Sequence, residues 1–572
     1  MSTASGKRKV QQTQAGVRLL ILLAILVGVN LLASRFHYGL DLTREKRFTL
    51  SNSSKKLLRH MEDVAVIEVY LEGKNHPPEF QRLKEAVRER LQSIKEYAGN
   101  HITYRFVDPF EGKSEKELSA IYRDFAARGM AGMNIARNET ERSVTQLMIP
   151  YAAVKYKDKE IPVQLFDDYI GMSSAERVTY SESTLEYKFV SAINQASKPD
   201  MPRIGYIMGN GEQLGFHTYD AVRSLAAYYH IDTLDLDMRR ISSVYSAIII
   251  CKPTVPFTEK QKFVLDQYIV HGGNVLLMAD GMVASMDSFR SSEQFVAVDN
   301  DLNLGDQFFR YGVRINNNII EDLRCAQIRL QDRKLNGEYV NVMKPWYYFP
   351  VFVPSSTHPI VKNMDAILSK FTSSIDTLPT PGIRKTVLLE TSQYSRPALS
   401  PVRVSLSMTR FTPKAELFNK GFMPTAVLLE GKFPSVFEGR LPGDFLRLLD
   451  SLKQPFTAKG EKESKIIVVG DGDIMLNSVS DRTGPLPMGF SYDEGIRYAN
   501  KSFFLNCVEY LTDTSGILEA RSKDVRVRLL DGERVANEKT KWQMVNIIIP
   551  IVFVLVFASC YIFFRKRRYE KR

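Results

Sequence analysis

Residues 247–279 read AIIICKPTVPFTEKQKFVLDQYIVHGGNVLLMA, and this stretch decides the predicted fold. The runs 247–251 and 274–279 predict two strands. Between them, a helix is expected to start at Thr258, a residue type that caps helices, and to end before the glycine pair 272–273. Continuous apolar strands are buried on both faces of a sheet. The strand–helix–strand order therefore predicts a doubly wound α/β sheet with helices on both sides.

The same alternation extends in both directions, which predicts at least two α/β units. In the first unit, the apolar run 64–71 precedes a helix with charges on one face and then a second strand, so a β-α-β arrangement is expected. The polar stretch 197–200, SKPD, is the expected boundary. The predicted elements are strands at 64–71, 101–107, 203–208, 231–236 and 465–469, a hairpin at 147–154 and 161–166, and helices at 79–97, 181–195 (capped by Ser181), 218–229, 258–270 and 502–511.

Positive charge gathers at the two ends of the chain beside apolar runs. Lys plus Arg number 77 against 65 Asp plus Glu, a net charge of +12, and most of it lies in residues 1–18 and 565–572. A nucleic-acid surface is therefore not indicated for the middle of the chain. The apolar runs 19–33 and 544–564 are candidate spans, and basic flanks stay cytoplasmic. Whether the first run is a retained span or a cleaved signal peptide stays open.

This pattern predicts single transmembrane helices at both ends of a large extracytoplasmic region. The second α/β domain is expected to hold the doubly wound sheet. The predicted layout is a cytoplasmic basic N-terminus (1–16), a transmembrane helix (17–36), a first extracytoplasmic α/β domain (37–200), a second one (201–511), a stalk (512–541), a transmembrane helix (542–564) and a cytoplasmic basic tail (565–572).

The glycine-rich turn at residues 209–215, GNGEQLG, is the candidate ligand-binding loop. Gly209, Asn210, Gly211 and Glu212 follow a predicted strand and precede a predicted helix, where backbone N–H groups can hold an anion. The third glycine of the dinucleotide fingerprint is missing, and a tight turn with positive φ explains the same glycines. No G-x-x-x-x-G-K-[ST] occurs, so ATP-driven work is expected to come from a partner.

Two carboxylates, Asp471 and Asp473, follow the strand 465–469 and are candidate loop carboxylates. They could hold a divalent cation, although aspartates after a core strand are more often turn or cap residues. The eight His residues show no metal-ligand spacing, and the four Cys fit neither a disulfide framework nor an activated nucleophile. We therefore predict no catalytic residue, no metal site and no cofactor.

From the residues alone, the chain is expected to be a membrane-anchored extracytoplasmic binding or assembly subunit. It also resembles the GldG family of Bacteroidetes gliding-motility proteins, which are auxiliary or substrate-binding-like components of ABC transporters. The resemblance lies in DLTREKRFTLS (41–51), YIMGNGE (206–212), LNLGDQFFRYGVRIN (302–316), IIVVGDGDIMLN (466–477) and the C-terminal span with its basic tail.

The resemblance implies a bacterial inner-membrane protein with its bulk in the periplasm, no enzymatic activity, and a polytopic permease and a cytoplasmic ATPase as partners. It also implies that the second domain is similar to a non-catalytic glutamine-amidotransferase-like domain. The family's glycine turn often reads GHGE, whereas Asn210 stands here, so no catalytic residue carries over. The ligand stays unknown.

Two alternatives remain. One is a membrane-tethered amidotransferase-like hydrolase, which needs Cys251 or Cys325 beside His217 or His271. The other is a purely structural anchor of an envelope motility or secretion complex that binds no ligand.

Overall fold

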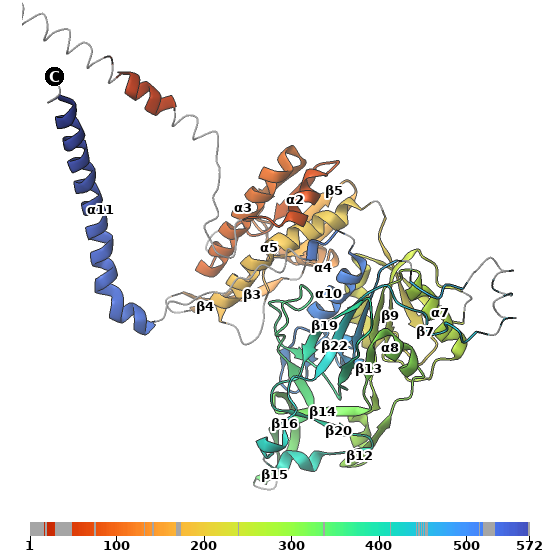
Figure 1. The fold of residues 1–572 in the computed structure, drawn as a ribbon. Helices are drawn as coiled ribbons and strands as arrows, with labels where there is room; N and C mark the ends of the chain where they lie inside the picture. The colour runs from red at the N-terminus through yellow and green to blue at the C-terminus, as the bar shows by residue number, and fades with distance from the viewer. Residues whose placement is uncertain are drawn as a thin grey trace, which may run out of the picture. The chain divides into compact units, whose positions relative to one another are not determined.

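The structure is a computed structural model of a chain that forms two compact units, residues 1–524 and 525–572 (Figure 1). Each unit is described by itself. The structure describes residues 17, 20–28, 49–73, 76–130, 132–139, 142–167, 173–198, 200–237, 240–335, 338–411, 413–441, 443, 447, 449, 451, 456–460, 462–513, 515–518 and 532–569.

The first unit begins with a four-stranded sheet in the order β2-β1-β5-β6. Strands β1 and β2 are parallel and joined through helix α3, which confirms the predicted β-α-β arrangement. The apolar stripe of α3 packs with α5 over this sheet, and the two helices and the strands share one core. The elements are α2 (Asn52–Arg59), β1 (Ala65–Val69), α3 (Pro78–Ala98), β2 (Ile102–Phe106), β5 (Tyr151–Tyr156), β6 (Lys159–Gln164) and α5 (Ser174–Ser197).

Helix α5 starts earlier than predicted. Ser173 is its N-cap, with Glu176 completing a capping box. Ser181, the predicted cap, is buried inside the helix, where its hydroxyl donates to the Arg177 carbonyl and accepts from the Asp167 N–H. The predicted helix start at Ser181 was wrong because a serine inside a helix can donate its hydroxyl hydrogen to the carbonyl four residues earlier.

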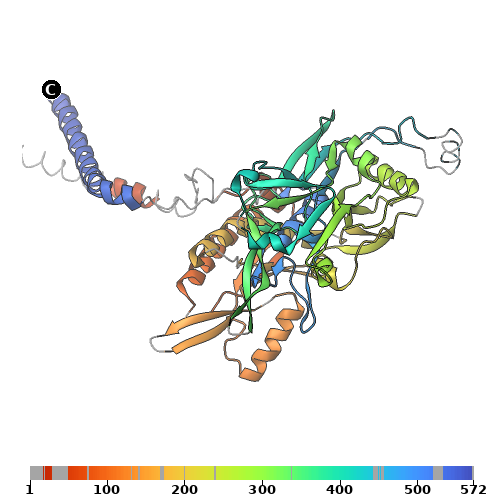
Figure 2. The same ribbon diagram turned by 90° about the horizontal axis from the view of Figure 1, so that it is seen from below.

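A helix and a hairpin between β2 and β5 were not predicted. Helix α4 spans Glu115–Ala127, and β3 (Met133–Glu139) pairs with β4 (Arg142–Met148) as a separate antiparallel hairpin, the pair of orange arrows in Figure 2. The hairpin predicted at 147–154 and 161–166 exists as β5 and β6. Pro150 separates β4 from β5, because proline cannot donate to a strand ladder.

The central sheet of this unit has seven strands in the order β19-β22-β23-β10-β9-β7-β8. Strands β8, β7, β9, β10 and β23 are mutually parallel, and β22 and β19 continue the sheet antiparallel. The bounds are β7 (Arg203–Met208), β8 (His230–Asp235), β9 (Tyr245–Cys251), β10 (Val275–Met278), β19 (Ile383–Glu390), β22 (Pro424–Gly431) and β23 (Ser464–Val469).

Both faces of this sheet are covered, as the apolar strands predicted. In β9, Ile249 packs into one core and Ile248 into the other, and the same alternation holds along β10 and β23. Helices α6 (Tyr219–Ala226) and α10 (Asn500–Thr512) cover the first face, and α7 (Glu259–Val270) and α8 (Gly305–Tyr311) the second. Burying each such Ile side chain contributes about 1.5–3 kcal/mol.

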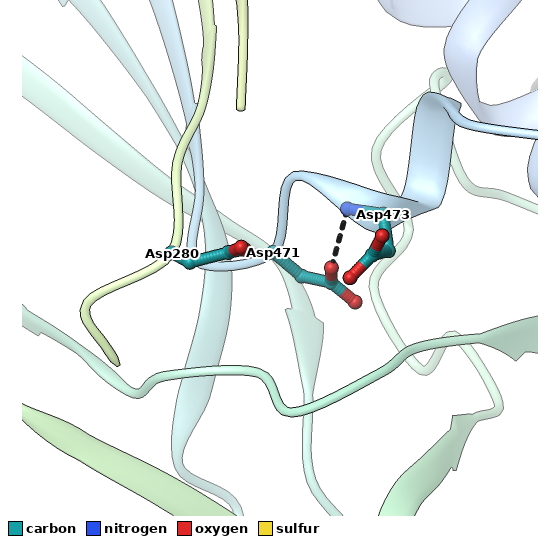
Figure 3. A group of neighbouring side chains, drawn as sticks. All are labelled: Asp280, Asp471 and Asp473. Carbon is teal, nitrogen blue, oxygen red and sulfur yellow. Dashed lines mark hydrogen bonds between the residues drawn. The ribbon is translucent and has the colours of Figure 1, made fainter. Parts of the chain in front are cut away.

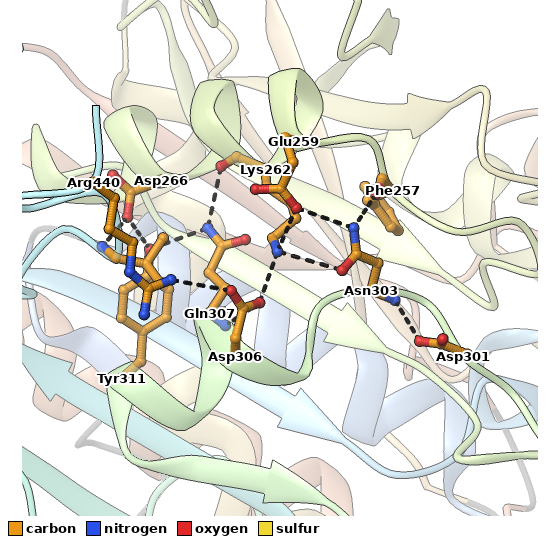
Figure 4. Close-up of polar contacts among 11 residues, drawn as sticks. Phe257, Glu259, Lys262, Asp266, Asp301, Asn303, Asp306, Gln307, Tyr311 and Arg440 are labelled. Carbon is orange, nitrogen blue, oxygen red and sulfur yellow. Dashed lines mark hydrogen bonds and ion pairs between the residues drawn. The ribbon is translucent and has the colours of Figure 1, made fainter. Parts of the chain in front are cut away.

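Helix α7 is fixed to α8 by a buried polar network (Figure 4). The Lys262 ammonium, 2% exposed, contacts Asp306 Oδ1 at 2.7 Å and the exposed Glu259 at 3.0 Å. The hydroxyl of Tyr311 donates to Asp266 Oδ1 at 2.8 Å, and Gln307 donates to the Lys262 carbonyl at 3.3 Å. The LNLGDQFFRYGVRIN segment (302–316) thus contributes to packing through its charged residues as well as its aromatic ones.

Between β10 and β22, the described part of the chain forms further strands that pair into several small sheets. The sequence predicted no regular pattern of elements in this region. Trp346 is fully buried in the core of these small sheets and makes edge contacts with Phe289 and Tyr348. The strands are β11 (Met282–Val283), β12 (Gln294–Asp299), β13 (Val313–Ile315), β14 (Asn318–Asp322), β15 (Cys325–Leu335), β16 (Glu338–Phe352), β17 (Ile367–Leu368), β18 (Ile375–Thr377), β20 (Ser395–Leu399) and β21 (Val402–Ser405), with β19 among them in the chain. Two small hairpins follow β23: β24 (Val479–Ser480) with β25 (Gly484–Pro485), and β26 (Phe490–Ser491) with β27 (Ile496–Arg497).

The second unit contains helix α11 (Gly532–Tyr569), which includes the predicted C-terminal span. Within it, residues 541–567 form a stretch long and apolar enough to cross a membrane, and in the described part of the chain no other helix meets this criterion. The helix continues through Pro550. Of the predicted N-terminal span 17–36, residues 20–28 are helical and the remainder lies largely outside the described residues.

Candidate functional site

Four charged side chains meet where three neighbouring parallel strands end. Lys252 follows β9, Asp280 lies two residues beyond β10, and Asp471 and Asp473 follow β23. The strand register places Met278 beside both Cys251 and Val469, so these three chain ends lie together. In open α/β sheets the carboxyl edge of the strands is the usual place for a site.

The three carboxylates converge, as Figure 3 shows, with one oxygen from each within 4.8 Å of the others. The Lys252 Nζ lies 2.5 Å from Asp473 Oδ2 and 3.3 Å from Asp280 Oδ2. Asp471 is fully buried and accepts hydrogen bonds from the Ser369 hydroxyl at 2.5 Å, from the Lys370 N–H at 2.7 Å and from the Asp473 N–H at 2.7 Å. We call these four residues the Lys252 cluster.

The backbone of the Lys252 cluster admits no side chain at Gly472. A Cβ there would lie 2.6 Å from Lys252 Cβ, and the Gly472 N–H donates to Asp280 Oδ1 at 2.6 Å. Lys252 itself has φ 49°, in the left-handed region that costs a non-glycine residue about 1 kcal/mol or more. Glycine in the Gly-Asp-Gly-Asp sequence (470–473) therefore allows the loop after β23 to pack closely against the loop after β9.

The electrostatics of the Lys252 cluster favour a proton on the Asp471 carboxyl. Burial, together with the charges of Asp473 and Asp280, raises the pKa of Asp471 to about 8. Burial also raises the pKa of Asp280, against the opposing effect of Lys252. Burial alone would lower the pKa of Lys252, but Asp473 and Asp280 raise it above its usual value. At neutral pH the cluster thus holds a protonated Asp471 beside the Lys252 ammonium.

A divalent cation is the other chemistry that these carboxylates offer. Three carboxylate oxygens at this separation suit Mg²⁺ or Ca²⁺. The Lys252 ammonium, however, already lies against Asp280 and Asp473, the two groups that a cation would need. The donor set therefore fits an internal ion pair better than a metal centre. Sequence reasoning found Asp471 and Asp473 but missed Lys252 and Asp280, although each of the two directly follows an apolar run of the sequence.

The stability of the fold is expected to fall as the pH rises from about 4 to about 8. An unfolded Asp ionises near pH 4, whereas folded Asp471 keeps its proton up to about pH 8, so the folded state binds more protons between these values. The free energy of unfolding should fall by at most about 1.4 kcal/mol per pH unit. Thermal unfolding at a series of pH values between about 4 and about 8 measures this loss of stability.

The matching control is Asp471→Asn, which cannot titrate. The amide that this substitution introduces has an NH₂ group where a carboxyl oxygen of Asp471 accepts hydrogen bonds. The variant is therefore expected to be less stable than the wild type at every pH. Its free energy of unfolding should also change less with pH. Asp481→Asn, in an exposed turn, should keep the wild-type slope. Equal slopes for Asp471→Asn and the wild type would contradict the protonated Asp471.

The glycine turn at 209–212 is closed against the loop after β9. The Asn210 carbonyl accepts from the N–H groups of Thr254 and Val255 at 2.8 and 2.9 Å. Gly209 and Gly211 have φ of 120° and 85°, and a Cβ on Gly211 would lie 2.0 Å from Thr254 Oγ1. Both glycines are therefore explained by the turn itself. Glu212 is buried, and burial raises its pKa.

The cysteine–histidine pairs of the hydrolase alternative are not brought together by any contact in the described residues. Cys251 is fully buried, its Sγ lies 3.7 Å from the Gly472 carbonyl oxygen, and burial raises the pKa of its thiol. Burial raises the pKa of Cys325 to about 12. His217 contacts the Asn477 carbonyl, and His271 contacts Thr457. Such thiols are poor nucleophiles at neutral pH.

The family model described as an ABC-type uncharacterized transport system matches residues 201–507, more than half of the chain. The match begins at the central sheet and includes the whole Lys252 cluster. A domain of unknown function matches residues 44–155. The chain belongs to the family of ABC-type uncharacterized transport system proteins, and within it is an auxiliary component of such a system.

An uncharacterized protein of Borreliella burgdorferi is 20% identical over 540 residues, which cover 93% of this chain and 94% of that protein. The solved structure of the mmIFT52 N-terminal domain shares 14% identity and covers 54% of this chain and 97% of that one. Its TM-score of 0.29 is too low to support an argument about fold or function.

Proposed function

We propose that this protein is a membrane-anchored extracytoplasmic subunit that works with a polytopic permease and a cytoplasmic ATPase. The observation that carries the proposal is the family match to an ABC-type transport system in a chain whose sequence contains no phosphate-binding loop. The apolar stretch 541–567 supplies the anchor. Such a chain needs a nucleotide-hydrolysing partner to take part in ATP-driven transport.

The role that we propose is binding or assembly, without catalysis. Its support is the chemistry of the described groups: Cys251 and Cys325 have raised pKa values, and the Lys252 ammonium is held in ion pairs. A reactive thiol or a free amine would need the opposite shift in each case. The Lys252 cluster then fixes three strand ends and the segment that carries Ser369 and Lys370.

A narrower form of the proposal connects the complex to gliding motility and places the bulk of the chain in the periplasm of a bacterial inner membrane. It rests on the resemblance to the GldG family in segments such as 41–51 and 302–316. Deleting the gene in a gliding host should then abolish spreading of colonies, with growth unchanged.

Both ends of the chain are expected to be cytoplasmic. Arg565, Lys566 and Arg567 directly follow the apolar stretch of α11, and basic residues beside a span remain on the cytoplasmic side. Reporter fusions at residues 5 and 572 should therefore both report cytoplasm. A periplasmic signal from either fusion would contradict this topology.

A further inference from the structure

A cavity of about 330 Å³ lies at the amino-terminal edge of the central sheet. Its lining includes Tyr245 at the start of β9, the glycine pair 272–273 shortly before β10, and Lys462 shortly before β23. We call this space the α7 cavity, because four further lining residues belong to α7 or to the cap at its end: Phe263, Gln267, Tyr268 and His271. The Lys252 cluster lies at the other edge of the same strands, so the two sites are separate.

Two cationic side chains line the α7 cavity without a partner. Arg240 and Lys462 are exposed, and neither makes a hydrogen bond or an ion pair in the described part of the chain. No described Asp or Glu belongs to the lining. Glu463, the neighbour of Lys462, lies outside the lining, and its charge acts on Lys465. The protein therefore does not neutralise these two cations by an ion pair.

The end of helix α7 does not account for these cations. Lysine and arginine side chains often bind the last carbonyls of a helix. Here backbone groups bind them, because the N–H groups of Gly272 and Gly273 donate to the Ile269 and Tyr268 carbonyls at 3.0 and 2.9 Å. The ammonium of Lys462 is thus not used as a helix cap.

Packing fixes the stem of Lys462 and the ring of Tyr268. A Cβ on Gly272 would lie 2.9 Å from Lys462 Cβ, and a Cβ on Gly273 would lie 2.4 Å from the Tyr268 ring. The Tyr268 hydroxyl also donates to the Tyr245 carbonyl at 3.2 Å. The lysine stem and the tyrosine ring therefore lie close against the backbone that leads into β10.

The other polar side chains of the α7 wall bind the protein itself. Gln267 accepts from the Thr457 N–H at 3.0 Å and donates to the Thr457 carbonyl at 3.1 Å. His271 Nε2 lies 3.2 Å from the Thr457 hydroxyl. Two half-buried aromatic residues, Tyr245 and Phe263, add apolar surface to the lining. The cavity thus combines aromatic surface with two unpaired cations.

We propose that the α7 cavity binds a small aromatic anion, with its acidic group at Arg240 and Lys462 and its ring against Tyr245 and Phe263. A guanidinium fits a carboxylate or a phosphate, because each accepts two parallel hydrogen bonds from it. Aromatic side chains contribute apolar area and edge or offset contacts to a planar ligand. The volume of about 330 Å³ is within the range of small-ligand pockets. The site does not depend on the transport partners.

Saturation-transfer NMR on the full-length protein in zwitterionic nanodiscs tests the site, with empty nanodiscs as background. The probes are phenylacetate, phenyl phosphate, neutral phenylacetamide and acetate. At least one of the two aromatic anions should bind, and phenylacetamide and acetate should bind at least about tenfold more weakly than that anion. Binding of phenylacetate alone identifies a carboxylate site, binding of phenyl phosphate alone a phosphate site, and binding of both a site for either group.

Four variants locate the binding. Arg240→Gln and Lys462→Met should each weaken it about fivefold, since each removes one unit charge close to the anion. Their melting temperatures should stay unchanged, because both side chains are exposed and unpaired. The double variant Arg240→Glu with Lys462→Glu should lose phenylacetate and gain affinity for benzylamine. Lys414→Met, which changes an exposed lysine outside the lining, should bind as the wild type does.

The charge-reversed double variant separates recognition of charge from loss of structure, because a damaged cavity would not acquire affinity for a cation. The proposal is overturned if neither aromatic anion binds, or if phenylacetamide or acetate binds as tightly as the aromatic anions. It is also overturned if both single variants keep the wild-type affinity, or if the double variant fails to reverse the preference from phenylacetate to benzylamine.

Discussion

Replacing Lys252 by Met is expected to lower the free energy of unfolding by about 3–5 kcal/mol, because it leaves buried carboxylates without their cation. The ammonium lies against Asp473 and Asp280, and it is 18% exposed. Methionine has a similar length and meets the same left-handed backbone at φ 49°, so backbone strain nearly cancels in the comparison. Urea unfolding followed by circular dichroism measures the difference.

A divalent cation should restore part of the stability of this variant. Without Lys252, one oxygen from each of three aspartates lies within 4.8 Å of the others, an arrangement that accepts Ca²⁺ or Mg²⁺. Millimolar Ca²⁺ should therefore raise the melting temperature of Lys252→Met and leave that of the wild type unchanged. Lys116→Met, which changes an exposed lysine of α4, serves as the control. If Lys252→Met is as stable as this control, the ion-pair account of the cluster is wrong.

The second large effect is expected at Asp306, the carboxylate that neutralises buried Lys262. Asp306→Ala should cost about 2–4 kcal/mol, because the 2% exposed ammonium keeps only the exposed Glu259 and a long contact to Asn303. Replacing both partners, as Lys262→Met with Asp306→Ala, should recover most of the loss, since no buried ammonium then remains without its carboxylate.

A variant of the same helix provides the control for Asp306. Glu259, 68% exposed, also contacts Lys262, and Glu259→Ala should cost less than about 1 kcal/mol because water already screens this pair. Chemical denaturation of the wild type, Lys262→Met, Asp306→Ala and the double variant gives the coupling energy between the two side chains. A double variant no more stable than Asp306→Ala alone would contradict the importance of the ion pair between buried Lys262 and Asp306.

The core of the fold could be predicted because its signals are local. The run AIIIC predicted a strand buried on both faces, and Thr258 predicted the start of the next helix; β9 and α7 confirm both. Thr258 accepts a hydrogen bond from the Gln261 N–H, as the capping rule requires. Strands β12, β13 and β14 of the β-rich region could not be paired from the sequence, because their partners β21, β18 and β20 lie far along the chain.

The Lys252 cluster could be predicted only in part, for the same reason. Asp471 and Asp473 are adjacent in sequence and were found together, whereas Lys252 and Asp280 come from strands more than 190 residues away. Only the strand order brings them to one edge. The glycine turn shows the converse, since its spacing resembles a ligand loop while Asn210 and Thr254 close it by backbone hydrogen bonds that no spacing reveals.

Affinity purification of the full-length protein from native membranes, followed by mass spectrometry, tests the central claim most directly. The account predicts that a polytopic permease and an ATPase with a phosphate-binding loop are recovered with it in comparable amounts. It also predicts that the complex hydrolyses ATP while the separated chain does not, since the chain lacks that loop. Recovery of the chain without either partner, or ATP turnover by the chain alone, would contradict its role as an auxiliary subunit.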